Sequence, residues 1–63
     1  MKTIYVEAQY DEERRQLRMR ARAEDAMDYY RVVMDDVASQ DAAVPHLRSF
    51  IKLYEDMGCR VAL

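Results

Sequence analysis

Apolar and polar residues alternate along residues 2–10, Lys-Thr-Ile-Tyr-Val-Glu-Ala-Gln-Tyr. One face of an extended chain would carry Ile4, Val6, Ala8 and Tyr10. β-Branched and aromatic residues in regular alternation are typical of a half-buried strand. A single strand leaves its backbone hydrogen-bonding groups without partners, so we expect a second strand to pair with it.

Residues 14–23, Arg-Arg-Gln-Leu-Arg-Met-Arg-Ala-Arg-Ala, show the same period of two and are the predicted partner strand. A hairpin with its tip at residues 12–13 brings apolar residues opposite apolar residues and acid opposite base, which stabilises a sheet. The expected opposing pairs are Ile4 with Ala21, Val6 with Met19, Ala8 with Leu17, Glu7 with Arg18, and Tyr5 with Arg20. A register shift of two residues preserves both faces, so the pattern favours the pairing more strongly than the register.

The same stretch also fits a helix. Apolar residues from Met19 to Val37 follow a heptad-like spacing, and Arg, Gln, Leu, Met and Ala are strong helix formers. The alternative fold is therefore an all-α helical hairpin with a long first helix. We prefer the β-hairpin because it gives residues 2–10 a local partner and places Leu17 on the buried face.

In the preferred fold, residues 24–39 are expected to form a helix. Asp25 is a suitable N-cap, and Asp28 in the first turn suits the positive end of the helix dipole. Apolar residues recur at intervals of three and four, as on the buried side of a helix: Ala26, Met27, Tyr30, Val33, Met34 and Val37.

A second helix is expected to begin near Pro45, whose missing N–H costs nothing in a first turn, and to end before Gly58. Its apolar positions are Leu47, Phe50, Ile51, Tyr54 and Met57. Residues 39–43 would connect the two helices, and residues 59–63 would form a short edge strand or fold onto the core. The predicted fold is one α+β domain over residues 1–63, a β-hairpin packed by two α-helices (ββαα).

The chain has 63 residues, which is near the lower size limit for a self-sufficient core. Cys59 is the only cysteine, so an intramolecular disulfide cannot form, and a single His adds too few ligands for a structural zinc site. Oligomerisation is the remaining common stabiliser, so we expect a homodimer. No apolar run approaches the roughly 20 residues of a membrane span, and we expect a cytoplasmic protein with no membrane partner.

The net charge of −2 conceals a strong separation of charge along the chain. Residues 14–22 contain five arginines and no acid. As a strand they would present Arg18, Arg20 and Arg22 beside Tyr5, and cationic with aromatic side chains is one way to hold nucleic acid. The simpler interpretation is a solvated face neutralised by the nearby glutamates at positions 7, 12 and 13. The negative net charge favours that second interpretation.

Residues 24–41 contain six acids and one arginine. The candidate acidic surface for a basic partner is formed by Asp25, Asp28, Asp35 and Asp36 of the predicted helix, together with Asp41. Ordinary solubility is the simpler interpretation. Tyr29 lies on the flank of the apolar positions and is a further candidate contact, because tyrosine is enriched in interfaces.

We expect no catalytic, cofactor or metal site. His46 and Cys59 would stand at opposite ends of the second predicted helix, about 18 Å apart at roughly 1.5 Å of rise per residue. A single glycine excludes a glycine-rich phosphate loop, and the acids lack the spacing of a calcium loop. No segment carries the motif of a particular family.

These features indicate a small non-enzymatic protein–protein interaction module, a regulator or inhibitor that binds and occludes a larger protein or complex. Short phage-encoded inhibitors, including those directed at host defence complexes, are similar in size and style, which is an analogy only. The alternative is a nucleic-acid-binding protein that uses the arginine-rich strand face.

Overall fold

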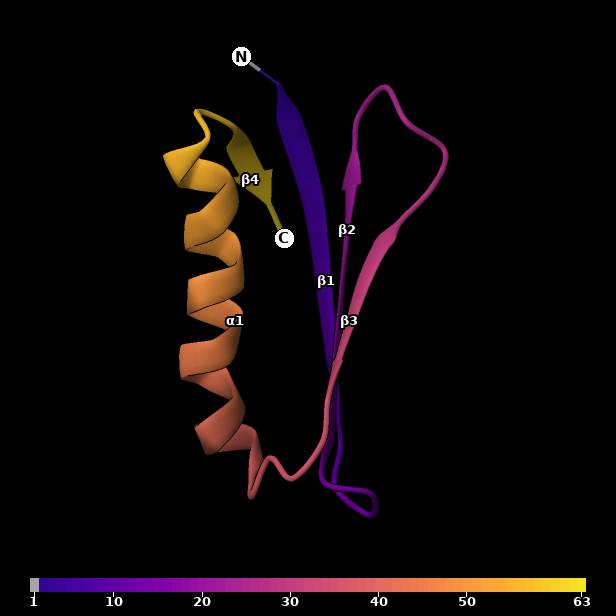
Figure 1. Cartoon of the computed structure of the whole chain (residues 1–63), viewed down its shortest axis with the longest axis vertical. Helices are drawn as coiled ribbons and strands as arrows, with labels where there is room; N and C mark the ends of the chain where they lie inside the picture. The colour runs from indigo at the N-terminus through magenta and orange to yellow at the C-terminus, as the bar shows by residue number, and fades with distance from the viewer. Residues whose placement is uncertain (1) are drawn as a thin grey trace.

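The computed structural model describes residues 2–63, which form a four-stranded mixed sheet and one α-helix. The elements are β1 (Thr3–Asp11), β2 (Gln16–Ala23), β3 (Tyr30–Met34), α1 (Gln40–Asp56) and β4 (Arg60–Ala62). The strand order is β3-β2-β1-β4, with β4 parallel to β1 and the other neighbours antiparallel. The helix lies along one side of the sheet, and the opposite side is left uncovered (Figure 1).

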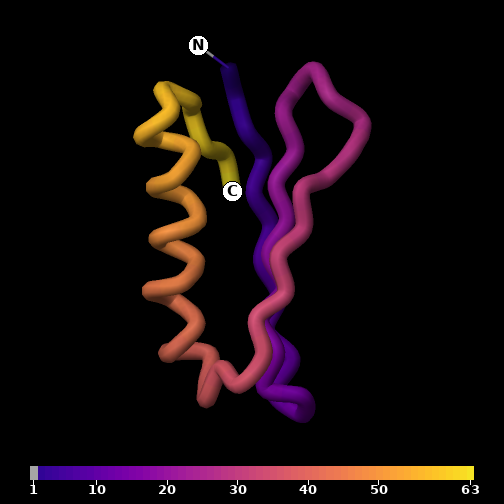
Figure 2. Tube along the Cα trace, in the orientation of Figure 1, coloured from indigo at the N-terminus to yellow at the C-terminus, as the bar shows by residue number. Residues whose placement is uncertain are grey.

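The predicted β1–β2 hairpin is present, and its two strands run side by side over their whole length (Figure 2). Its register differs by two residues from the expected one, so Val6 pairs with Ala21 and Glu7 pairs with Arg20. The four-residue turn between the strands includes Arg15 at a φ of 50°. A two-residue shift keeps every side chain on its face, which is why the alternation along the strands did not reveal it.

The predicted helix over residues 24–39 is wrong, and with it the ββαα architecture and the all-α alternative. These residues form a loop, the strand β3 and a second loop, although the class is still α+β. Tyr30, Val32 and Met34 also alternate, and they lie opposite Ala21, Met19 and Leu17 of β2 on the face that carries α1. Pairing with the free edge of β2 satisfies backbone groups that a helix would leave unpaired on that strand.

The single helix begins five residues before the expected position at Pro45, and residues 40–43 belong to it rather than to a connection. Ser39 is the N-cap, and its Oγ accepts a hydrogen bond of 3.1 Å from the backbone N–H of Ala42. This bond satisfies one of the free donors of the first turn. Pro45 lies inside the helix, where its missing N–H removes one helical hydrogen bond. Gly58, at a φ of 85°, follows the helix end as predicted.

The core is small and lies between α1 and the inner face of the sheet. Tyr10 and Val37 fasten the hairpin to the start of the helix, because the Tyr10 hydroxyl donates to the Val37 carbonyl at 2.6 Å. The Val37 amide in turn donates to the carbonyl of Arg15 at 2.9 Å. The buried apolar residues among residues 2–63 are Ile4, Val6, Leu17, Met19, Ala21, Val37, Ala43 and Phe50.

We predict that Leu17→Ala lowers the free energy of unfolding by about 2–5 kcal/mol, measured by urea denaturation. Leu17 is 2 % exposed and belongs to the core, so the substitution leaves a cavity there. A domain of this size is stable by only about 3–9 kcal/mol, so a large share is lost. The matched control is Leu63→Ala at an 85 % exposed position, which changes stability by less than about 0.5 kcal/mol. Equal effects of the two substitutions would contradict this core.

Candidate binding surface

The uncovered face of the sheet carries most of the candidate residues. Side chains alternate between the two faces of each strand, so every second residue of β1, β2 and β3 points away from α1. We call the arginines and tyrosines of this surface the basic face, and its members are Tyr5, Arg18, Arg20, Arg22, Tyr29 and Arg31. Tyr29 comes from the loop just before β3, where it lies against arginines of β2.

Arg20 is held at the centre of the basic face by two neighbours. Its Nε donates to Glu7 Oε2 at 2.7 Å, its Nη2 donates to the same oxygen, and its guanidinium carbon lies 4.4 Å from the centre of the Tyr29 ring. The hydrogen bonds to Glu7 raise the pKa of Arg20, which therefore stays cationic. The pair is exposed, so its main effect is to fix the position of the side chain.

Arg22 is held in a different way, by aromatic rings and backbone carbonyls. Its guanidinium lies 5.3 Å from the Tyr5 ring centre and 5.9 Å from that of Tyr29. Its Nη1 donates to the carbonyls of Ala26 at 2.8 Å and Ala23 at 3.3 Å. These contacts connect the loop after β2 to the sheet and leave other N–H groups of Arg22 available.

Arg18 and Arg31 form no ion pair with any residue in the described part of the chain. Arg18 Nε donates only to Gln16 Oε1, at 2.8 Å. Both arginines line a shallow hollow of about 460 Å³ on the basic face, together with Arg20, Glu7 and Val33. Glu7 is bound to Arg20, so the guanidinium groups of Arg18 and Arg31 are free to pair with the carboxylates of a ligand.

The expected neutralisation of the arginines by three glutamates is therefore incomplete. Only Glu7 reaches the basic face, and it pairs with Arg20 instead of Arg18 because of the shifted register. Glu12 and Glu13 lie in the turn beyond the strand ends and form no ion pair with residues 2–63.

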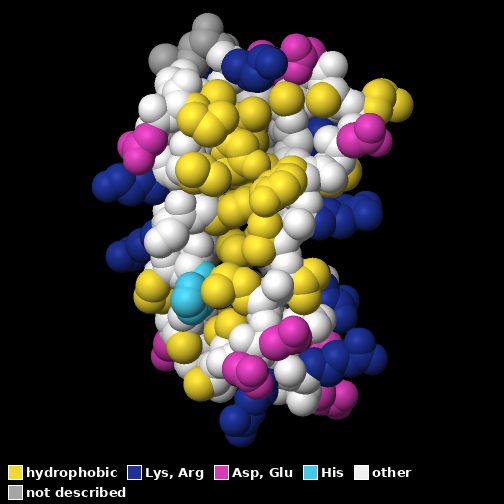
Figure 3. Space-filling model, viewed as in Figure 1, with side chains coloured by type: hydrophobic (Ala, Val, Ile, Leu, Met, Phe, Trp, Pro, Cys, Tyr) yellow, Lys and Arg dark blue, Asp and Glu magenta, His cyan; other side chains and the backbone are white. Residues whose placement is uncertain are grey.

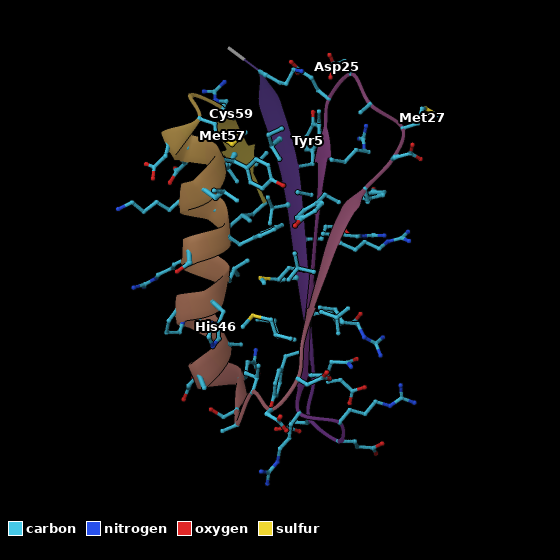
Figure 4. All side chains as sticks on the ribbon, in the orientation of Figure 1. Tyr5, Asp25, Met27, His46, Met57 and Cys59 are labelled. Carbon is cyan, nitrogen blue, oxygen red and sulfur yellow. The ribbon has the colours of Figure 1, made fainter. Side chains whose placement is uncertain are left out.

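The predicted acidic surface does not exist, because the helix that would have carried it is absent. Asp25 and Asp28 lie in the loop between β2 and β3, where Asp25 pairs with Lys2 at 3.6 Å (Figure 4). Asp35 and Asp36 follow β3 at the other end of the sheet. Asp35 Oδ1 accepts a hydrogen bond of 2.9 Å from Gln16 Nε2, and Asp36 has a φ of 60°.

A second feature is a partly exposed apolar stripe between β3 and α1, which runs down the middle of the molecule in Figure 3. The stripe is formed by Tyr30, Val32 and Met34 of β3 with Phe50 of α1. Tyr30 is exposed, Val32 and Met34 are half-buried, and Phe50 belongs to the buried core. The rings of Tyr30 and Phe50 stack at 6.4 Å between centroids, yet Tyr30 remains 60 % exposed. Tyr30 and Val33 were expected on a buried helix face and are exposed instead, because they belong to an edge strand.

Two titratable groups of the described residues have clearly displaced pKa values, and Arg20 is one of them. The other is Tyr54, whose pKa is raised by burial. His46 lies near the start of α1 and Cys59 lies beyond its other end (Figure 4). Within residues 2–63, no group of three His, Cys, Asp or Glu side chains could hold a metal ion. In the same range, no helix has the length and apolar character needed to cross a bilayer.

Sequence reasoning missed Arg31 and Val33, because both were placed on a helix. The signal that could have found them is the alternation of Tyr30, Val32 and Met34, which leaves residues 31 and 33 on the opposite face. Comparison of the chain with protein-family models, with curated proteins and with solved structures finds no match.

We predict that Tyr29→Leu lowers the melting temperature by about 2–5 °C, measured by circular dichroism. The substitution removes the ring on which Arg20 and Arg22 lie but keeps an apolar side chain of similar size. Tyr29→Phe keeps the ring and should melt with the wild type. If Tyr29→Phe loses as much as Tyr29→Leu, stacking on the ring does not stabilise the basic face.

Proposed function

We propose that the protein is a small non-enzymatic interaction module, a regulator or inhibitor that binds an acidic site of a larger protein and occludes it. The observation that supports the proposal is the basic face, where Arg20 and Arg22 are held in place while Arg18 and Arg31 have no ion-pair partner among residues 2–63. The proposal includes a cytosolic site of action, in keeping with the single free thiol of Cys59.

Arginine and tyrosine are the residue types that most often dominate the energy of protein interfaces. A guanidinium can bind a carboxylate through two parallel hydrogen bonds, so Asp or Glu side chains of a partner fit the hollow on the basic face. Arg20 and Arg22 are already ordered by Glu7, Tyr5 and Tyr29, which lowers the entropy lost when a partner binds.

The size of the molecule suits occlusion. It measures 37 × 22 × 14 Å, and a standard interface buries about 800 Å² on each partner. That area is roughly a sixth of its 4898 Å² accessible surface, so one sheet face can supply the interface. A bound copy would cover the acidic site of the partner with a rigid sheet.

Nucleic-acid binding is the second candidate, and the observation in its favour is the same combination of arginine and tyrosine on an open sheet. Two features weigh against it. The net charge is −2, and Arg22 covers both the Tyr5 and the Tyr29 rings, which are then less free to stack on bases. The protein partner is therefore the better supported of the two.

We predict that Arg18→Ser/Arg22→Ser weakens binding to the partner by at least about 30-fold, as expected when interface arginines are lost. The partner is first captured with tagged wild-type protein from the producing cells and identified by mass spectrometry, and its Kd is then measured by calorimetry. The control Arg48→Ser/Lys52→Ser makes the same change of charge at exposed positions of α1 and should bind like the wild type.

Three results would count against the proposal. Equal loss in both double variants would show that total charge, rather than the basic face, determines binding. Failure to capture any specific partner would remove the protein-binding proposal. Binding of single-stranded RNA or DNA that weakens linearly with the logarithm of salt concentration, and is lost in Arg18→Ser/Arg22→Ser, would favour the nucleic-acid candidate.

A further inference from the structure

β3 is an edge strand whose outer side is open. No strand lies beyond it in the sheet formed by residues 2–63. The backbone N–H and C=O groups on that side are therefore available to another strand. Natural edge strands usually carry features that prevent such pairing. The other edge of the sheet is protected by being short, because β4 has three residues.

The sequence of β3 contains neither proline nor lysine, and its side chains are unusually apolar for an edge. Tyr-Arg-Val-Val-Met is rich in residues that favour strands. Val33 is 56 % exposed on the uncovered face of the sheet, which we call the outer face. Tyr30 is exposed on the opposite face, which carries the apolar stripe. Such an edge is suited to pairing with a further strand.

The charged residues on either side of Val33 are complementary to those of a second copy of the chain. Arg31 and Val33 are two residues apart in β3, so they share one face of the strand. Asp35 follows the end of β3, and its carboxylate accepts a hydrogen bond of 2.9 Å from Gln16 of β2, whose side chain lies on that same face of the sheet. In an antiparallel pair of two β3 strands centred on Val33, Arg31 of each copy lies opposite Asp35 of the other.

In the same register, apolar side chains also meet on the face of the sheet that carries α1. Val32 of one copy lies opposite Met34 of the other. The neighbouring registers are worse. Centring on Arg31 sets the two arginines against each other, and centring on Val32 places Arg31 opposite Val33, with no acid facing it. Like charges directly opposite one another destabilise a sheet, whereas opposite charges stabilise it. Only the register centred on Val33 satisfies both charges and both faces.

The accessible surface is also larger than that of a typical monomer. A folded chain of 7.5 kDa is expected to expose about 4,250 Å², whereas this chain exposes 4898 Å². The excess of about 650 Å² approaches the roughly 800 Å² that each partner buries in a standard interface. The apolar stripe includes side chains of β3, so apolar surface lies next to the open edge (Figure 3).

We propose that two copies of the chain pair through β3 in this register, around a two-fold axis at Val33, to form a continuous eight-stranded sheet. The strand order is then β4-β1-β2-β3 followed by the same four strands of the second copy in reverse. Both basic faces lie on one side of the joined sheet, so the dimer presents two arginine clusters on a single surface. The pairing shares Arg31 with the basic face but uses none of the arginines of β2, so its test is separate from that of the proposed function, which removes Arg18 and Arg22.

Charge reversal and its rescue test the dimer, with mass measured by sedimentation equilibrium. Wild-type protein should give the dimer mass. Arg31→Asp and Asp35→Arg should each weaken dimerisation at least about tenfold, because two-fold symmetry changes an attractive pair into a repulsive one at two places. An equimolar mixture of these two variants should recover the dimer mass as a heterodimer, since each acid again faces an arginine.

The mixture also guards against misfolding, because chains that recover the dimer in the mixture are folded. Arg60→Asp changes the same charge on the β4 edge and should remain dimeric. The proposal is overturned if the wild type is a monomer at all concentrations, or if both single variants stay dimeric. A mixture that stays monomeric also overturns it when circular dichroism shows both variants folded. A strand of another protein would be the occupant of β3 if the wild type were monomeric alone and protected the β3 amides from hydrogen exchange only when bound.

Discussion

The whole arrangement depends on β2 being paired along both of its edges. β1 lies on one side and β3 on the other, both antiparallel. Two-sided pairing holds β2 extended, and in an extended chain the period-two sequence separates completely into two rows. Leu17, Met19 and Ala21 enter the core, whereas the arginines that alternate with them reach solvent together. The apolar row that stabilises the sheet and the cationic row available for binding are thus two consequences of one pairing pattern.

A single helix then determines which surfaces stay open. α1 contacts the sheet mainly at β1 and β4, so it leaves the outer face uncovered and shields β3 poorly. Residues 2–63 form no second layer that would cover either region. The basic face, the apolar stripe and the open edge of β3 therefore have a common origin in a sheet that is too wide for one helix. A protein with this geometry has more surface for interactions than core for stability.

Local pattern was sufficient to predict the hairpin, the α+β class, the glycine after the helix and the cluster formed by the arginines of β2 with Tyr5. It was insufficient for residues 24–39, where six apolar residues fit a helical spacing while Tyr30, Val32 and Met34 also fit a strand spacing. The strand forms there because it pairs with the free edge of β2. That pairing is a non-local interaction, which the local pattern does not reveal. The prediction of an acidic surface was wrong because it required that helix, and Arg31 was missed for the same reason. The hairpin register escaped prediction because a two-residue shift leaves both faces unchanged.

Nuclear Overhauser contacts between β2 and β3 test the central position of β2 most directly. The structure predicts cross-strand contacts that join Leu17 to Met34 and Met19 to Val32. A network of contacts between residues three apart throughout residues 24–39, without cross-strand contacts to β2, would instead show a helix there. That result would remove β3, the open edge and the outer face as described, whereas the predicted contacts would establish the sheet on which all three depend.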